Sequence, residues 1–310
     1  MTTTGCGTRW SGWSASRPTT WPSTPTNSLN ERARTGDPGV DEPPPGPWVW
    51  ERKYELDSLC YPVRLAHRLW RRTGTTDHLD DATLAMLRTV VDTMTIEQDH
   101  DASSGYWFGR GVPASDTLPH DGKGSPVART GMVWSGFRPS DDACAFHYLV
   151  PANMFAVVSL AQLAEIVTEV YADIELADRA STLAGQIRIG IDEHAVIEHP
   201  VHASIWAYEV DGLGNRLLAD DANTPSLLSA PYLGYCAPDD PVYLATRAFV
   251  LSAENPYYFS GSAASGLGSP HTPDRYIWPM GLAMVGLTST DRAEQDALLE
   301  TLPATTAGTG

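Results

Sequence analysis

The sequence predicts an all-α protein in which helices form a toroid and long loops gather on one of its faces. Apolar residues recur at helical spacing in several segments from Trp48 onward. No run of alternating apolar and polar residues persists long enough to predict a strand. Long loops rich in glycine and aromatic residues separate the expected helices, and such loops often carry the functional groups of a helical scaffold.

The first expected helix covers residues 54–74, where the sequence reads YELDSLCYPVRLAHRLWRRTG. Its apolar residues recur every three or four positions, at Leu56, Leu59, Val63, Ala66 and Leu69. Gly74 is a suitable stop because glycine readily adopts the left-handed conformation that ends many helices. The same periodicity predicts a second helix over residues 83–98.

A long loop follows, from about residue 99 to residue 142, and it is rich in Gly, Ser, Pro and Asp. Loops of this length inside a compact domain are usually functional or disordered. Helical periodicity returns over residues 151–171, with Pro151 at the start, and over residues 174–194. A polar loop over residues 199–221 comes next. Shorter helical segments complete the pattern at residues 224–235, 241–252, 276–287 and 291–302.

Residues 1–47 differ in composition from the rest of the chain and are crowded with Thr, Ser, Arg, Trp and Pro. The segment has neither helical nor strand periodicity and ends in a proline-rich stretch, so we expect it to be irregular or disordered. Residues 48–310 are expected to form one domain, because a chain of 310 residues with 42% hydrophobic residues can bury one sizeable core.

Composition also limits the partners. The net charge of −17 would repel nucleic acid and anionic membrane surfaces, so a neutral substrate is the simpler expectation. No apolar run approaches the roughly 20 residues that span a bilayer, and the N-terminus lacks the pattern of a signal peptide. The four cysteines fall in no metal-binding spacing, which favours free thiols in a reducing compartment. We therefore expect a cytoplasmic protein.

Four loop segments concentrate polar residues beside glycines and aromatics, and they make up the candidate functional site. They cover residues 50–58, 130–142, 207–223 and 266–279. Loops collected at one mouth of a toroid can direct several carboxylates into a common pocket.

The adjacent carboxylates Asp220 and Asp221 have two interpretations. They precede a helical segment, where Asp is a common N-cap because its carboxylate accepts free backbone N–H groups. The alternative is a general acid, since a carboxyl group near another carboxylate or in a poorly solvated pocket keeps its proton at neutral pH.

Two further sets of residues also have both a structural and a functional interpretation. Arg138, Asp141 and Asp142 are either a surface Asp–Arg cluster or a group that grips hydroxyls of a substrate. His271, which lies between prolines in the segment SPHTP, either binds substrate or braces its loop.

No metal site and no cofactor are expected. The scattered histidines form no metal-binding motif; they are His67, His147, His199 and His202. The glycine-rich motifs that bind dinucleotides or nucleotide phosphates are absent, as is the motif of a serine nucleophile.

A series of long segments, from about Trp48 to Gly310, carries a family resemblance. In chain order they read WERKYELDSLCYPVRLAHRLW, TGMVWSGFRPSDDAC, YLVPANMFAVVSL, WAYEVDGLGN, DDANTPSLLSAPYLGY, NPYYFSG and GSPHTPDRYIWPMGLAM. These segments resemble, in the same order, the signature stretches of glycoside hydrolase family 125, the metal-independent α-mannosidases.

The resemblance implies an (α/α)6 barrel that removes terminal α-1,6-linked mannose from glycans with inversion at the anomeric carbon. An inverting enzyme uses one carboxylic acid to protonate the leaving oxygen and a second carboxylate to activate water. The acid is expected in the DDAN segment, at Asp221 in preference to Asp220. The partner would be an α-mannoside glycan, and the implied substrate-binding residues are Arg138, Asp141, Asp142, Glu55, Asp57 and His271.

The chain departs from the family pattern at both ends. In the family, TTAGTG continues into a segment like Met-His-Glu-Gly-Phe, whose glutamate resembles the general base, so the base is expected beyond Gly310. An upstream segment with an arginine and an aspartate of the sugar site has no counterpart here. We therefore expect a barrel that is incomplete at its first and last helices. An inactive remnant that binds mannose weakly, or another (α/α)6 glycosidase, remains the alternative.

The composition of residues 1–26 suggests a frameshift. Back-translation of residues 13–26 with GC-rich codons, read two nucleotides later, yields a sequence that ends in Asp-Pro-Tyr, as a helix of the family does. The in-frame sequence NSLNER then continues that helix. We hypothesise that the first 26 residues are the product of this frameshift.

Overall fold

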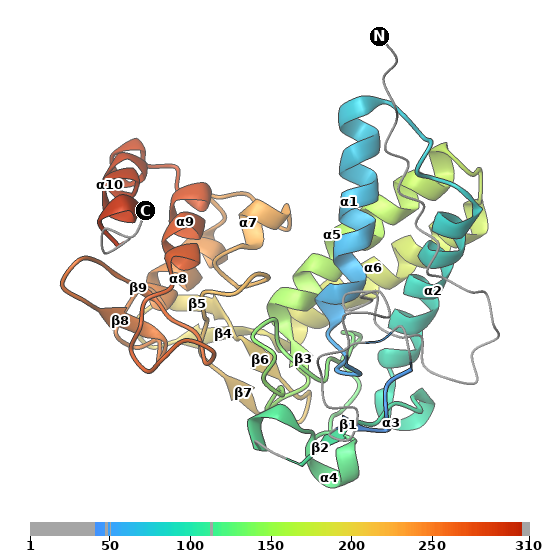
Figure 1. Cartoon of the computed structure of the whole chain (residues 1–310), viewed down its shortest axis with the longest axis horizontal. Helices are drawn as coiled ribbons and strands as arrows, with labels where there is room; N and C mark the ends of the chain where they lie inside the picture. Colours follow the sequence, from blue (N-terminus) through green and yellow to red (C-terminus); the bar gives the residue numbers. More distant parts are fainter. Residues whose placement is uncertain (1–40, 47–48, 50, 112–113, 306–310) are drawn as a thin grey trace.

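The computed structural model describes residues 41–46, 49, 51–111 and 114–305 (Figure 1). The expectations for residues 1–47, including the frameshift hypothesis, lie outside the described residues except at 41–46. There Asp41–Glu42 form β1, which pairs antiparallel with β2, Gly109–Arg110.

Helices account for most of the regular structure in the described residues. Their bounds are α1 Leu56–Thr73, α2 Asp81–Glu97, α3 His100–Ser103, α4 Pro119–Gly122, α5 Val150–Glu169, α6 Ile174–His194, α7 Ala230–Leu233, α8 Pro241–Val250, α9 Pro279–Thr288 and α10 Arg292–Ala304. The predicted helices are confirmed, and α6 begins and ends at the predicted residues. The segment 224–235 contributes only the short α7, and the predicted loop over 99–142 contains the short α3 and α4.

Short strands, which the sequence did not predict, pair in small antiparallel sheets. Besides β1 and β2, they are β3 Tyr148–Leu149, β4 Val196–His199, β5 Ala203–Trp206, β6 Glu209–Val210, β7 Arg216–Leu217, β8 Tyr258–Ser260 and β9 Ser265–Leu267. The sheets are β1–β2, β3–β6–β7, β4–β5 and β8–β9. These strands of two to four residues are too short to show an alternating pattern, and the chain is mostly helical, as the all-α prediction expects.

The helices lie in two groups, with the small sheets below and between them (Figure 1). One group contains α1, α2, α5 and α6, and in it α5 packs against both α1 and α6. The other contains α7 to α10, and in it α9 packs against α10. Helix α7 contacts both α5 and α9, so it connects the two groups.

Helix α5 is the central helix of the core. Among the described helices it is the one that is long and apolar enough, by length and composition alone, to cross a membrane. The sequence-based statement that no apolar run approaches this length was therefore wrong. However, 72% of its most apolar stretch is buried inside the protein, which is the pattern of a core helix.

Local signals in the sequence explain where several helices begin and end. Asp80, Asp173 and Asp240 precede α2, α6 and α8, and each carboxylate accepts a backbone N–H of the first turn. Gly74, with a φ of 72°, ends α1 in the left-handed conformation that the sequence predicted.

A stack of rings around Trp134 anchors the segment that precedes the candidate site. Trp134 is fully buried, and its ring stacks on those of His100 and His147, with centroids 3.8 and 4.6 Å away. Tyr54 is stacked parallel to the same ring at 6.2 Å. The predicted loop over 99–142 is thus held in the core, which determines where the turn that follows Trp134 lies.

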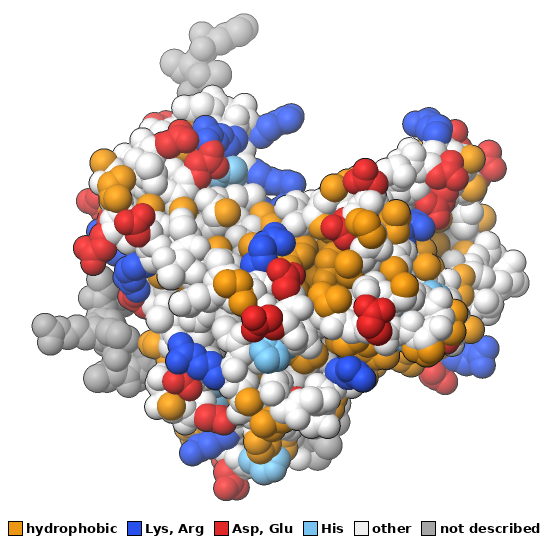
Figure 2. Space-filling model, turned by 180° about the vertical axis from the view of Figure 1, so that it is seen from behind, with side chains coloured by type: hydrophobic (Ala, Val, Ile, Leu, Met, Phe, Trp, Pro, Cys, Tyr) orange, Lys and Arg blue, Asp and Glu red, His pale blue; other side chains and the backbone are white. Residues whose placement is uncertain are grey.

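Several helices carry apolar side chains on an exposed face. On α1, Tyr61, Leu65 and Leu69 lie one turn apart and each is at least 38% exposed. Leu69, which the helical spacing grouped with the buried Leu56, Leu59, Val63 and Ala66, lies on this exposed stripe instead. Figure 2 shows hydrophobic side chains gathered beside a recess in the upper edge of the molecule.

Candidate active site

Asp220 braces the backbone of its own loop. Its carboxylate is fully buried and accepts the backbone N–H groups of Leu227 at Oδ1 (3.0 Å) and of Leu228 at Oδ2 (2.9 Å). Asn255 holds the backbone of Asp220, accepting its N–H at Oδ1 and donating from Nδ2 to its carbonyl. Burial raises the pKa of Asp220, whereas the two backbone N–H groups favour the charged carboxylate. Backbone N–H groups therefore occupy both carboxylate oxygens of Asp220, which fits the interpretation of this residue as a helix cap.

Asp221 has one oxygen that is not occupied in this way. The side chain is buried, and Oδ1 accepts the backbone N–H of Asn223 (2.8 Å) and its side-chain Nδ2 (3.1 Å). Oδ2 is buried and has no hydrogen-bond partner. Burial raises the pKa of the Asp221 carboxyl, opposed by Asn223 and by the charge of Arg138 and reinforced by Asp142. A carboxyl with a raised pKa and an open oxygen is suited to donating a proton.

A chain of polar contacts connects Asp221 to a second loop. Asn223 Nδ2 also donates to Ser269 Oγ (2.8 Å), and the backbone N–H of His271 donates to the same hydroxyl (3.3 Å). The His271 ring in turn lies between two carboxylates, with Nε2 3.2 Å from Asp141 Oδ2 and Nδ1 3.9 Å from Asp142 Oδ2. His271 therefore bridges its loop to the turn that carries the paired aspartates.

Arg138 is fixed by a glutamate that the sequence analysis did not select. Its Nε donates to Glu209 Oε1 (2.6 Å), and both side chains are buried. Glu209 Oε2 also accepts the backbone N–H groups of Ala145 and Phe146, each at 2.9 Å. Burial disfavours the charged form of Arg138, but the Glu209 carboxylate outweighs this and raises the pKa of the guanidinium. The guanidinium also lies over the ring of Tyr208, 5.6 Å from its centroid.

The turn from Arg138 to Asp142 presents its aspartates to the site. The backbone N–H of Arg138 donates to the Asp142 carbonyl, and that of Asp141 donates to the Arg138 carbonyl. Asp141 has a φ of 65°, a left-handed conformation that aspartate tolerates better than most residues. Lys53 Nζ donates to the Asp141 carbonyl (2.8 Å) and holds this conformation. The Asp141 side chain is 47% exposed, whereas that of Asp142 is 16% exposed.

Glu55 and Asp57 add two carboxyl groups from the start of α1. Ser58 Oγ donates to Glu55 Oε2 (2.9 Å), while Asp57 Oδ1 is buried without a hydrogen-bond partner. Burial raises the pKa of Asp57 to about 7, and the negative charge of Asp141 acts in the same direction. Burial, followed by the charge of Asp57, also raises the pKa of Glu55 well above its ordinary value. Asp57 thus exchanges its proton near neutral pH.

The predicted residues therefore form one connected group, with Asp220 turned toward the backbone instead. Two members were missed. Glu209 lies inside the quoted segment WAYEVDGLGN, but nothing in a single sequence distinguishes it from an exposed strand residue. Tyr257, from the segment NPYYFSG, interacts electrostatically with Arg138 and Asp221, and burial raises its pKa. Both residues lie in segments that resemble the family, and this resemblance is the sequence feature that could have pointed to them.

None of these residues belongs to a group arranged to hold a metal ion. In the part of the chain that the structure describes, one such group exists, formed by His199, His202 and Glu254. His147 is instead a core residue: its Nε2 accepts the N–H of Ser125 (2.8 Å), and Nδ1 donates to the Ser135 carbonyl (2.9 Å). Burial lowers the pKa of His147 to about 4.

The fold and the site together define a class of protein. A buried carboxyl with a raised pKa and an open oxygen lies near a buried arginine and several more carboxyl groups, all on loops of a mostly helical chain. Such an arrangement is typical of glycoside hydrolases, which pair a proton-donating carboxyl with other carboxylates. The chain belongs to the metal-independent α-mannosidases of glycoside hydrolase family 125, since the sequence profile of that family matches residues 21–310.

Two relatives extend this finding. The chain is 40% identical over 273 residues to the meiotically up-regulated gene 157 protein of Schizosaccharomyces pombe, covering 84% of this chain and 53% of the relative. A Streptococcus pneumoniae structure is similar with a TM-score of 0.86 and 47% identity, covering 91% of this chain and 66% of that one. It is described as a metal-independent α-mannosidase in a non-productive substrate complex with α-1,6-mannobiose. The chain spans about half the length of the S. pombe relative.

Proposed function

We propose that this chain carries the general acid and much of the sugar site of an inverting exo-α-1,6-mannosidase. The observation that carries the proposal is Asp221 Oδ2, which is buried and has no hydrogen-bond partner. Burial raises the pKa of this carboxyl and so favours the neutral form that has a proton to give. Asp220 is the weaker candidate because backbone N–H groups occupy both of its oxygens.

In the proposed reaction, Asp221 transfers its proton to the glycosidic oxygen as the bond between that oxygen and the anomeric carbon breaks. The electron pair of the bond goes to the oxygen, which leaves as a hydroxyl of the remaining glycan. A water molecule forms the new bond from the opposite face and loses its proton to a base. Attack from the opposite face inverts the anomeric configuration.

The other residues of the site would bind the sugar. Arg138, oriented by Glu209, offers N–H donors for hydroxyl groups, while Asp57, Asp141 and Asp142 offer acceptors. The α-1,6-mannobiose in the S. pneumoniae structure supports a mannoside as the substrate, and the net charge of −17 suits a neutral sugar.

We also propose that the helices belong to an (α/α)6 toroid. The exposed apolar faces of α1 and α9 support this, since Leu65 is 57% exposed and Leu287 is 63% exposed, and further helices of a toroid would bury them. The general base is proposed to lie in the segment that follows TTAGTG in the family pattern. The alternative is a chain that binds mannose without turning it over.

One assay separates these proposals. The chain as given and a version extended through the Met-His-Glu-Gly-Phe segment are compared for mannose release from α-1,6-mannobiose. We expect turnover by the extended version and mannose binding without turnover by the chain as given. Equal turnover by both would contradict the assignment of the base.

A matched pair of variants tests the acid. In the extended version, Asp221→Asn should lower kcat by about 10²- to 10⁴-fold, the usual contribution of general acid catalysis. Asp220→Asn should mainly lower the thermal stability, because it weakens the brace formed with residues 227–228. If the folded Asp220→Asn protein loses turnover while Asp221→Asn retains it, the two assignments are reversed.

A further inference from the structure

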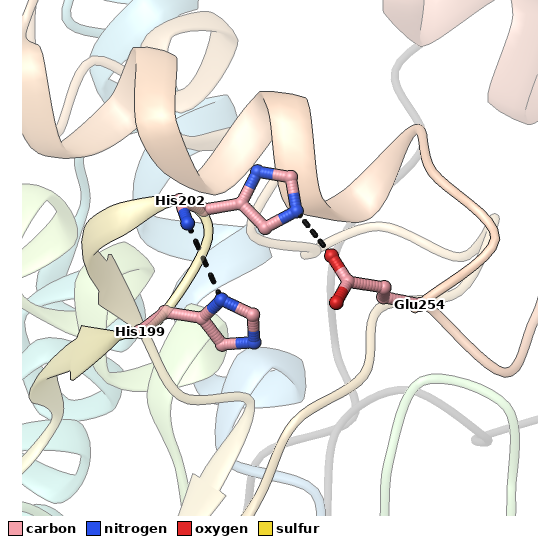
Figure 3. Close-up of side chains that lie close together, drawn as sticks. All are labelled: His199, His202 and Glu254. Carbon is pink, nitrogen blue, oxygen red and sulfur yellow. Dashed lines mark hydrogen bonds and ion pairs between the residues drawn. The ribbon is translucent and has the colours of Figure 1, made fainter.

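A second cluster of reactive side chains lies at the β4–β5 hairpin. His199 ends β4 and pairs with Ala203, so three residues form the turn and His202 is the last of them. Glu254 comes from the segment between α8 and β8. Figure 3 shows the two imidazoles and the carboxylate pointing toward one another. One nitrogen of each ring and one carboxylate oxygen all lie within 4.8 Å of one another.

The hairpin and α8 hold the two rings in place. The backbone N–H groups of Val201 and His202 donate to His199 Nδ1, each at 3.3 Å. His202 Nε2 lies 2.5 Å from Glu254 Oε2. Phe249, a buried residue of α8, supports both rings, with centroids 5.6 Å from His199 and 5.9 Å from His202. The His202 ring is therefore held by Glu254 and Phe249 before any ligand binds, and the His199 ring rests on Phe249.

Two imidazoles and one carboxylate, with further positions open to water, are a ligand set that suits Zn²⁺. The ion would lie about 2.0–2.2 Å from each ligand atom. The 2.5 Å contact between His202 and Glu254 must therefore widen to admit it, while His199 must move closer. The Glu254 side chain is 45% exposed and can move, while the His202 side chain is 13% exposed.

His199 must change tautomer to take part. In the neutral ring, Nδ1 accepts the two turn N–H groups, so the proton resides on Nε2. The turn is exposed, with Val201 at 69%, so water can replace these long contacts when the proton moves to Nδ1. Nε2 is then free to bind the ion.

We propose that His199, His202 and Glu254 form a Zn²⁺ site that ties the β4–β5 turn to the segment after α8. The site lies outside the group around Asp221 and supplies nothing to its proton transfer. It acts as a support: Glu254 directly precedes Asn255, whose side chain holds the backbone of Asp220. Bound Zn²⁺ therefore steadies the segment on which the candidate acid depends, which is compatible with metal-independent chemistry.

The test uses the full chain, stripped of metal with a chelator and then dialysed. Isothermal titration with ZnCl₂ should give one saturable site, and saturating Zn²⁺ should raise the Tm by about 3–6 °C. Mg²⁺ and Ca²⁺, which prefer sets of oxygen ligands, should not bind. Glu254→Gln, at an exposed position, and His202→Ala should each weaken the Kd for Zn²⁺ at least about tenfold. His194→Ala, on α6 outside the cluster, is the control and should leave the Kd unchanged.

Three results would overturn the proposal. They are the absence of saturable 1:1 binding, an unchanged Kd in Glu254→Gln, and an equal loss of binding in His194→Ala. Glu254→Gln keeps the test decisive if His202→Ala fails to fold, because its side chain is not part of the core.

Discussion

Asp57→Asn should stabilise the protein at alkaline pH, although Asp57 belongs to the candidate site. The carboxyl is buried beside the charge of Asp141, and its pKa is raised from 3.8 to about 7. The unfolded chain therefore releases this proton near pH 4 and the folded chain near pH 7. The destabilisation caused by the buried Asp57 charge is absent below pH 4. It grows as the pH rises between the two pKa values and is complete above pH 7. At 1.36 kcal/mol per pH unit it reaches about 4 kcal/mol.

Urea unfolding of the wild type and of Asp57→Asn, followed by circular dichroism at pH 4.5 and pH 8, measures the effect. Asparagine cannot ionise, so the free energy of unfolding of the variant, relative to the wild type, should increase by about 3 kcal/mol between these pH values. Asp77→Asn, at an exposed position, is the control and should show a difference that is independent of pH. A constant difference for Asp57→Asn would refute the reasoning that burial of this charge costs stability.

Three further substitutions have definite expected outcomes. His147→Asn should reduce the loss of stability on acidification, because keeping the buried wild-type ring neutral, with a pKa of about 4, costs roughly 2 kcal/mol at pH 5. A wild-type free energy of unfolding in urea that does not change between pH 7 and pH 5, relative to that of the variant, would disprove this. Glu209→Gln should lower the free energy of unfolding by about 3 kcal/mol because it leaves the buried charge of Arg138 without an opposite charge, and the exposed Glu193→Gln should not. Gly212→Ala should lower the Tm more than Gly214→Ala: both have positive φ, but only the Gly212 Cβ would meet backbone, 2.4 Å from the Ala128 carbonyl.

The candidate site could be predicted in part because its residues lie in a few polar loop segments. Arg138, Asp141 and Asp142 share one turn, so the sequence already placed them together. Glu209 could not be found in the same way, because it is 71 residues from Arg138 in the chain and its role depends on being folded against that side chain.

The proposed Zn²⁺ ligands illustrate the same limit. His199 and His202 match no known metal-binding spacing, so the sequence alone does not predict a metal site there. Their third partner, Glu254, is 52 residues from His202 in the chain and comes near it only because α8 packs against β5. Single-sequence motifs do not record ligands that distant segments bring together.

The sequence by itself determined the long helices and the family. The helical spacing of apolar residues, the Asp caps and the stop at Gly74 each act within a few residues of the chain. Helices α1, α2, α5 and α6 therefore follow from local physical chemistry. Only the tertiary structure decided which of two adjacent aspartates keeps a carboxylate oxygen without a hydrogen-bond partner. Asp220 and Asp221 are chemically identical in the sequence, but the backbone at 227–228 occupies the oxygens of one and leaves Oδ2 of the other open.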